Sequence, residues 1–141
     1  MTAIEMAEQK GRGRALMLLV FATASLLVLL FSFGERGTDF WRGLWLGMTA
    51  AAAVNLLPLG RWLKPHSKVA RLLDDEATRE HRHRSTAAGF WAAVAVGVVL
   101  SALVKEGLAV SPFDVARTIV TAAVFTALVG FAALELRAAR D

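Results

Sequence analysis

Four apolar stretches alternate with short polar ones along the chain. The first runs from Ala15 to Phe33 and holds 19 residues without a charged side chain. At about 1.5 Å per residue, such a helix crosses a hydrocarbon core of roughly 30 Å. The pattern predicts an all-α fold, a polytopic four-helix membrane bundle formed by residues 1–141 as a single domain. We expect the membrane spans at about 15–33, 40–60, 85–104 and 113–134.

Residues that break or cap helices mark the boundaries between the expected spans. Gly37 lies in the short polar turn that precedes the second span. Pro58, near the end of that span, removes a backbone donor and predicts a kink or an early stop. Ser111 is a good helix cap, with Pro112 at the first helical position and Asp114 at the third. The helix that carries the fourth span is therefore expected to begin at Pro112, just before the span itself.

The longest polar segment is the connection 61–84, which is densely charged in its second half. Its first half is either a short amphipathic segment at the headgroups or a loop packed on the bundle. In the second half, Glu80 and Arg84 stand at i,i+4, and no helix breaker lies between Asp74 and Ser85. We therefore expect one continuous helix in which the charged segment extends the third span into the cytoplasm.

Lys and Arg residues are unevenly distributed between the two sides of the expected bundle. The amino-terminal tail carries 3, the connection carries 7 and the carboxy-terminal tail carries 2, so 12 lie on one side. The two short turns carry 2 each, which places 4 on the other side. Positively charged loops stay in the cytoplasm. The count predicts that both termini and the connection are cytoplasmic.

Composition agrees with this class of protein and excludes several others. The chain is 56% apolar, with a mean hydropathy of +0.51, which is typical of integral membrane proteins. Its net charge of +4 indicates orientation and contact with anionic lipids, because no nucleic-acid recognition module is visible. We expect the lipid bilayer as a partner and no nucleic acid. The absence of cysteine excludes disulfides, thiolate metal sites and cysteine nucleophiles.

Small residues recur every four positions in the later spans and indicate close helix packing, within the bundle or between subunits. The expected packing residues are Gly43, Gly47, Ala51, Gly89, Ala93, Gly97 and Gly130. The first span lacks such a stripe and is rich in leucine. We therefore expect the first span to be the outermost helix, facing lipid.

The spans offer few residues for chemistry. None carries an ionisable side chain in its apolar centre, which argues against proton-coupled transport. Asn55, Ser101 and Thr126 are polar and could line a small pore, so a channel or carrier for a small solute is the first alternative function. No nucleophile motif is visible, and we expect no enzymatic activity and no cofactor.

The charged helix is the main candidate for function. Its expected interaction residues are Asp75, Glu76, Arg79, Glu80, His83 and Arg84. Glu80 and His83 also form a Glu-x-x-His pair, the spacing found in carboxylate metal sites. Only one copy of the pair exists, so a metal site at this helix is the second alternative, and no metal ligands are assigned.

The segment from Asp74 to Glu80, followed by basic residues and a span, resembles a short acidic signature of small uncharacterised bacterial membrane proteins. It departs from that signature at Ala77 and Thr78. The resemblance implies a four-span protein of the bacterial inner membrane and carries no activity. Our leading hypothesis is a non-enzymatic interaction or accessory subunit that acts through the charged helix, as a homo-oligomer or in a larger membrane complex.

Overall fold

The computed structural model describes residues 3–32, 39–56 and 76–138, and this part of the chain is built from four α-helices. Helix α1 spans Ala3–Phe31 and α2 spans Asp39–Leu56. Helix α5 spans Glu76–Lys105 and α6 spans Pro112–Ala138. The expected all-α fold is confirmed for these residues.

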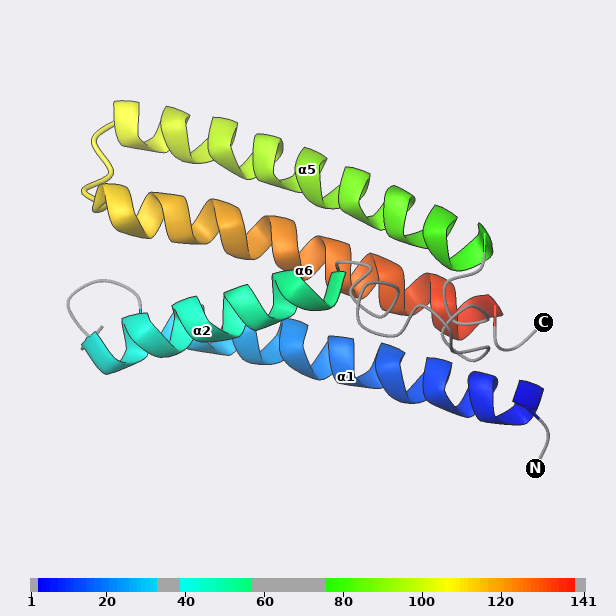
Figure 1. Cartoon of the computed structure of the whole chain (residues 1–141). Coiled ribbons are helices and arrows are strands. Elements are labelled where there is room, and N and C mark those ends of the chain that lie inside the picture. Colours follow the sequence, from blue (N-terminus) through cyan, green and yellow to red (C-terminus); the bar gives the residue numbers. More distant parts are fainter. Residues whose placement is uncertain (1–2, 33–38, 57–75, 139–141) are drawn as a thin grey trace.

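Helix α6 is the centre of the arrangement. It packs against α5 on one side and against α1 on the other, while α2 lies on α1 and also contacts α6 (Figure 1). Helices α1 and α5 finish, and α2 and α6 begin, at one end of the bundle, which we call the turn end. The opposite end holds the start of α1, the start of α5 and the end of α6, and we call it the terminal end (Figure 1).

Three of the helices are long and apolar enough to cross a membrane, which supports a membrane protein built as a helix bundle. They are the segments Gly11–Phe31 of α1, Thr78–Lys105 of α5 and Pro112–Ala138 of α6. Helix α2 has 18 residues and carries Asp39 and Arg42 in its first turn, so it does not reach the same apolar length. The second span was expected to continue to residue 60, and residues 57–60 lie outside the described part.

The expectation that α1 is the outermost helix is wrong. In the apolar 18-residue stretch of each segment, 33% of the α1 residues and 28% of the α6 residues are buried, against 6% for α5. Alanine and serine alternate with leucine on one face of α1, and this face packs on α6. The leucine content of α1 therefore reflects both its core face and its outer face.

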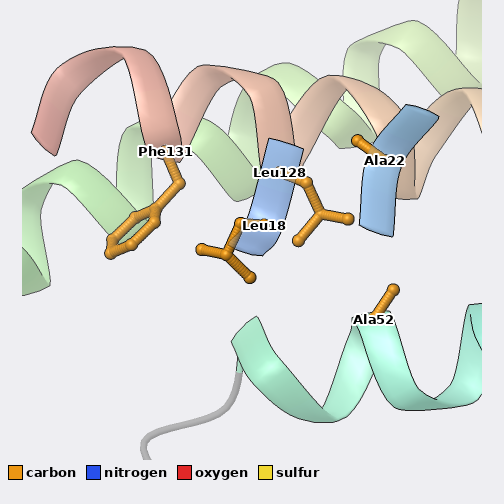
Figure 2. Close-up of a cluster of buried hydrophobic side chains, with 5 residues drawn as sticks. All are labelled: Leu18, Ala22, Ala52, Leu128 and Phe131. Carbon is orange, nitrogen blue, oxygen red and sulfur yellow. The ribbon is translucent and has the colours of Figure 1, made fainter. Parts of the chain in front are cut away.

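The apolar core lies between α1, α2 and α6. Leu18 and Ala22 of α1 meet Ala52 of α2 and Leu128 of α6, with Phe131 beside them (Figure 2). Two of these five residues are alanines, so the helix backbones approach closely. A second cluster of Val28, Leu29 and Trp45 lies nearer the turn end.

The local signals at the helix ends act as expected. Ser111 Oγ accepts a hydrogen bond from the backbone N–H of Asp114 (3.1 Å) and donates one to Asp114 Oδ2 (2.8 Å). This reciprocal pair caps α6, which begins at Pro112. Gly107 adopts φ 99°, a left-handed conformation that favours glycine, directly after the end of α5.

The charged segment and the third apolar run form one helix. Helix α5 continues without interruption from Glu76 to Lys105. The expected continuous helix is confirmed from Glu76 onward, while its expected start at Asp74 lies outside the described residues. Charged residues such as Glu80 are therefore held in a fixed position relative to the apolar half of α5.

Candidate functional site

A buried arginine lies at the turn end, where α1 finishes and α6 begins. The Arg117 side chain is 1% exposed, although it belongs to the apolar helix α6. Its Nη2 donates to Ser32 Oγ (2.6 Å) and to the Ser32 carbonyl (3.2 Å), with the Leu29 carbonyl at 3.5 Å. The last carbonyls of a helix lack partners within the helix and carry partial negative charge. Arg117 therefore caps the carboxy-terminal end of α1.

Two aromatic rings enclose the same guanidinium. Arg117 Cζ lies 5.5 Å from the Trp45 ring and 5.3 Å from the Phe113 ring, within the range of cation–π contact. Trp45 Nε1 donates to Thr121 Oγ1 (2.9 Å), one helical turn beyond Arg117. Side chains of α1, α2 and α6 are thus connected through one polar cluster.

Asp114 balances the charge of Arg117 only loosely. Its Oδ1 lies 3.8 Å from Arg117 Nη1, which is beyond hydrogen-bond distance, while its Oδ2 is engaged by Ser111. Among the described residues, Arg117 Nε and Nη1 have no hydrogen-bond partner. A buried donor without a partner costs about 1–3 kcal/mol. The cluster therefore has hydrogen-bonding capacity that the described side chains leave unused.

Two further hydroxyl groups are buried elsewhere on α1 and α2. Ser25 lies two turns before Ser32 on α1, and Thr49 lies one turn after Trp45 on α2. Both side chains are buried, and Ser25 Oγ and Thr49 Oγ1 have no hydrogen-bond partner within the described part of the chain. Buried polar groups of this kind are usually satisfied by water or a bound molecule.

The sequence analysis did not identify Arg117 as a site residue. Arg117 was counted with the basic residues of the second short turn, because Ser111, Asp114 and Arg117 all precede the uncharged run that begins at Thr118. The sequence signal that identifies Arg117 as buried is its position on the apolar face of α6. Leu128, Thr121 and Asp114 follow one another at steps of seven residues, and Arg117 lies one turn before Thr121. All four residues therefore share one face of α6.

The expected interaction residues lie at the terminal end of α5. Arg79, Glu80, His83 and Arg84 are exposed, and Arg84 Nε donates to Glu80 Oε1 (2.7 Å). The side chains of Asp75 and Glu76 lie outside the described residues. A neighbouring histidine that we had not singled out, His81, connects α5 to α6 through a 3.2 Å contact between its Nδ1 and Glu135 Oε1.

Three of the expected packing glycines lie in the contact between α5 and α6. A Cβ atom on Gly89 would lie 2.6 Å from the Ala123 carbonyl oxygen. A Cβ atom on Gly97 would lie 3.6 Å from Ile119, and one on Gly130 would lie 3.5 Å from Ser85. The short distances at these three positions support a close-packing role for each glycine.

The remaining expected packing residues are less constrained. Gly43 and Gly47 are exposed on α2, where an added Cβ atom would have no neighbour within 4 Å among the described residues. Ala51 and Ala93 are half-buried. The role of the α2 stripe in packing stays a prediction.

The structure does not bring the three expected lining residues together. Asn55 lies in the last turn of α2, where its Nδ2 donates to the Ala51 carbonyl (2.8 Å). Its own carbonyl accepts from Arg14 Nη2 (3.2 Å). Ser101 is exposed near the turn end and donates to its own helix at the Gly97 carbonyl (2.7 Å), while Thr126 is half-buried on α6.

Within the described residues, no three histidine, aspartate or glutamate side chains gather where they could hold a metal ion. Glu80, one half of the expected Glu-x-x-His pair, is engaged with Arg84.

Comparison with known protein families, with curated protein sequences and with solved structures finds no match for this chain. The class of protein is therefore defined by the structure itself, a helix bundle with three apolar helices that fit a membrane.

Proposed function

We propose that this chain is a non-enzymatic integral membrane protein that acts as an interaction or accessory subunit, with α5 as its contact element. The observation that carries the proposal is the exposure of α5. In its apolar 18-residue stretch only 6% of the residues are buried, and its extensive contact is with α6. A helix attached to the bundle along one face leaves its other faces available to a partner.

The rigidity of α5 supports this role. The exposed charged residues Arg79, Glu80 and Arg84 belong to the same unbroken helix as the apolar half. Small residues lock this helix against α6, with Gly89 at the tightest contact. A partner that binds a preformed helix does not have to offset the entropy of ordering it. The mixed charges contribute more to the specificity for one partner than to the binding affinity.

We place the protein in the bacterial inner membrane, with both termini and the charged end of α5 in the cytoplasm. The distribution of 12 Lys and Arg residues against 4 supports this orientation. The fold is compatible with it, because the start of α1, the start of α5 and the end of α6 share the terminal end (Figure 1).

Charge reversal on α5 tests the proposal. A triple variant Arg79→Glu, His83→Glu and Arg84→Glu should lose co-purifying proteins or self-association in nanodiscs, because the exposed face then carries only acidic charges and these repel the same face of another copy or an acidic group of a partner. Glu106→Lys, an exposed change at the turn end, is the matched control and should behave as the wild type. An unchanged set of co-purifying proteins and unchanged association in the triple variant would contradict the proposal.

A second candidate function, a small channel or carrier, is favoured by the Arg117 cluster. Arg117 Nε and Nη1, Ser25 Oγ and Thr49 Oγ1 are buried without hydrogen-bond partners in the described part of the chain. Such groups could bind a small solute that accepts hydrogen bonds, and arginine favours anionic solutes.

Liposome flux tests this second function. Uptake of chloride, formate or acetate by wild-type proteoliposomes should fall in Arg117→Gln and persist in Arg42→Gln, which changes an exposed arginine at the same end. Absence of flux for these anions and for a panel of neutral solutes in the wild type would exclude the function.

A further inference from the structure

We propose that α1, α2 and α6 enclose a binding site for a short carboxylate, such as formate or acetate, which enters from the turn end. The inference rests on the second candidate function and names the solute, its site and its side of entry. The site consists of the buried hydroxyls of Ser25 and Thr49 and the guanidinium of Arg117.

The buried seam between these three helices is polar in one half and apolar in the other. On each helix, the buried polar residues that the structure describes lie between the turn end and the apolar cluster of Figure 2. Polar side chains inside a membrane bundle typically face water or a bound solute. The polar half therefore favours a binding site, and the apolar half closes this site toward the terminal end. The buried polar residues are Ser25, Ser32, Thr49, Asp114, Arg117 and Thr121.

The hydroxyls of Ser25 and Thr49 differ from other hydroxyls on α1. Thr23 Oγ1 donates to the Leu19 carbonyl (2.9 Å), and Ser32 Oγ bonds its own helix in the same way. This is the usual bond of a hydroxyl group within a helix. Ser25 Oγ and Thr49 Oγ1 have no partner in the described part of the chain, although these residues are only 1% and 7% exposed. Both hydroxyls can therefore bind a molecule enclosed between the helices.

The packing of α1 on α2 places the two hydroxyls at one level of the bundle. On α1, Ser25 lies one turn before Leu29, and on α2, Thr49 lies one turn after Trp45. Leu29 and Trp45 belong to the same packed cluster. Three residues from each hydroxyl in the other direction, each helix reaches an alanine of the apolar cluster. Ser25 and Thr49 therefore lie between the same two layers of packed side chains.

Arg117 contacts the layer next to these hydroxyls. Its Nη2 lies 3.5 Å from the Leu29 carbonyl oxygen, and its Cζ lies 5.5 Å from the Trp45 ring. Nε and Nη1 of the same guanidinium are buried donors without a hydrogen-bond partner among the described residues. Carboxylate oxygens accept hydrogen bonds from guanidinium and hydroxyl donors, and bonds to a charged group are the stronger ones. The donor set therefore suits a carboxylate.

The other wall of the site suits a small alkyl group. Ala22 and Ala52 form the side of the apolar cluster that adjoins the hydroxyls, and both are fully buried. A carboxylate group bound by Arg117 and the hydroxyls directs its carbon substituent toward these alanines. A halide ion has no apolar part to place there. The site is thus expected to prefer formate, acetate and propionate to chloride.

The site is closed less thickly on the turn-end side than on the terminal side. Phe113 covers the Arg117 guanidinium at 5.3 Å and is itself 47% exposed. Toward the terminal end, Leu18, Leu128 and Phe131 continue the apolar seam and are almost fully buried. Entry from the turn end requires movement of one half-exposed ring, whereas passage in the other direction requires the helices to separate. The structure therefore fits a carrier more closely than an open channel.

Acetate binding to the purified full-length protein tests the proposal, with Ser25→Ala and Thr49→Val as site variants. The wild type should bind radiolabelled acetate saturably, and formate or propionate should displace it while chloride should not. Each site variant should bind about tenfold more weakly, because one hydrogen bond to a charged ligand is lost. Ser101→Ala and Thr23→Val are matched controls that remove exposed hydroxyls bonded to their own helix, and they should bind as the wild type.

Unfolding in SDS separates binding from a structural role of the hydroxyls. Removal of a buried hydroxyl without a partner should leave the stability of the ligand-free protein unchanged or raised. Acetate should then stabilise the wild type and the controls more than Ser25→Ala or Thr49→Val. A site variant that is less stable than the wild type without acetate would show that its hydroxyl already has a partner in the protein, and would overturn the proposal.

The side of entry is tested with cysteine, which the chain lacks. Maleimide modification of Phe113→Cys should lower acetate binding about tenfold relative to the unmodified variant, because the added group covers Arg117. Modification of Arg84→Cys, an exposed position at the terminal end, should leave binding unchanged. The reverse result would place the entry at the terminal end and overturn the proposal.

The remaining outcomes distinguish the site from the transport function. Absence of saturable binding of all three carboxylates would show that the hydroxyls hold only water, and equal binding by site variants and wild type would place the site elsewhere. Either result would overturn the inference. Anion flux that is unchanged in Ser25→Ala and Thr49→Val would also overturn it and leave the transport function standing. Acetate bound at this site without any flux would remove the transport function and support the site.

Discussion

Groups from three helices offset the cost of burying the Arg117 guanidinium. Carbonyls and a hydroxyl at the end of α1 accept from its Nη2, Asp114 of α6 supplies the opposite charge, and Trp45 of α2 covers the guanidinium. Transfer of an arginine into an apolar region without such partners costs several kcal/mol. The residue therefore determines how these three helices meet at the turn end.

Removal of the Arg117 charge should destabilise the protein strongly. Arg117→Leu leaves the nearly buried Asp114 carboxylate without its counter-charge and uncaps α1, so we expect a loss of about 3–5 kcal/mol in the free energy of unfolding. The measurement is SDS-induced unfolding in micelles, followed by circular dichroism.

A double variant provides the internal control for this prediction. Adding Asp114→Asn to Arg117→Leu should recover part of the loss, because the unpaired charge is removed while the cap of α6 is kept. Arg42→Leu, which changes an exposed arginine, should cost less than about 1 kcal/mol. A double variant as unstable as the sum of its single changes would show that the two residues are not coupled.

The α5–α6 hairpin depends on backbone proximity more than on large side chains. Gly89 faces the Ala123 carbonyl and Ala127, and Gly130 faces Ser85. Lipid supplies no hydrophobic drive for helices to associate, so dispersion between closely approaching backbones has to hold them together. Position 89 therefore tolerates no side chain without movement of one helix.

Gly89→Ala should separate the two helices. Its Cβ would lie 2.6 Å from a backbone oxygen, which cannot rotate away, and we expect a loss of about 1–3 kcal/mol in unfolding free energy. Gly47→Ala is the matched control. It adds the same methyl group on an exposed helix face and should leave stability unchanged or slightly raised, since alanine favours helix. Equal destabilisation by both changes would contradict this account.

At the scale of the whole molecule, the two ends of the bundle differ in their content of basic residues. The terminal end gathers the first turns of α1, the charged start of α5 and the end of α6, which together hold seven of the 16 Lys and Arg residues. The turn end instead withdraws one of its few basic residues, Arg117, from solvent. Burial of Arg117 therefore leaves the turn end less positive than the sequence count implies.

Labelling of single cysteines tests the orientation. In cells, Glu106→Cys should react with a membrane-impermeant maleimide, because the turn end is expected to face outward. Arg79→Cys should react only after the membrane is permeabilised. Labelling of Arg79→Cys in intact cells, with Glu106→Cys protected, would reverse the proposed topology.

The local elements could be predicted from the sequence because their causes are local. Long uncharged runs form apolar helices, Ser111 and Pro112 start α6, and the unbroken charged segment continues into α5. These outcomes depend on backbone hydrogen bonding and on side chains a few residues apart. For the same reason, the exposure of Glu80 and Arg84 followed from their position on the helix.

The tertiary structure alone decided which helices pack together and what their contacts hold. The leucine-rich α1 is more buried than α5, and the expected lining residues are apart, with Asn55 beside Arg14 of α1 and Ser101 in the last turns of α5. Arg117 appears in the sequence as a flanking charge, since its compensating groups lie 85 residues away at Ser32 and on α2. Periodicity indicates that a face is buried, whereas the identity of its neighbour depends on contacts between distant segments.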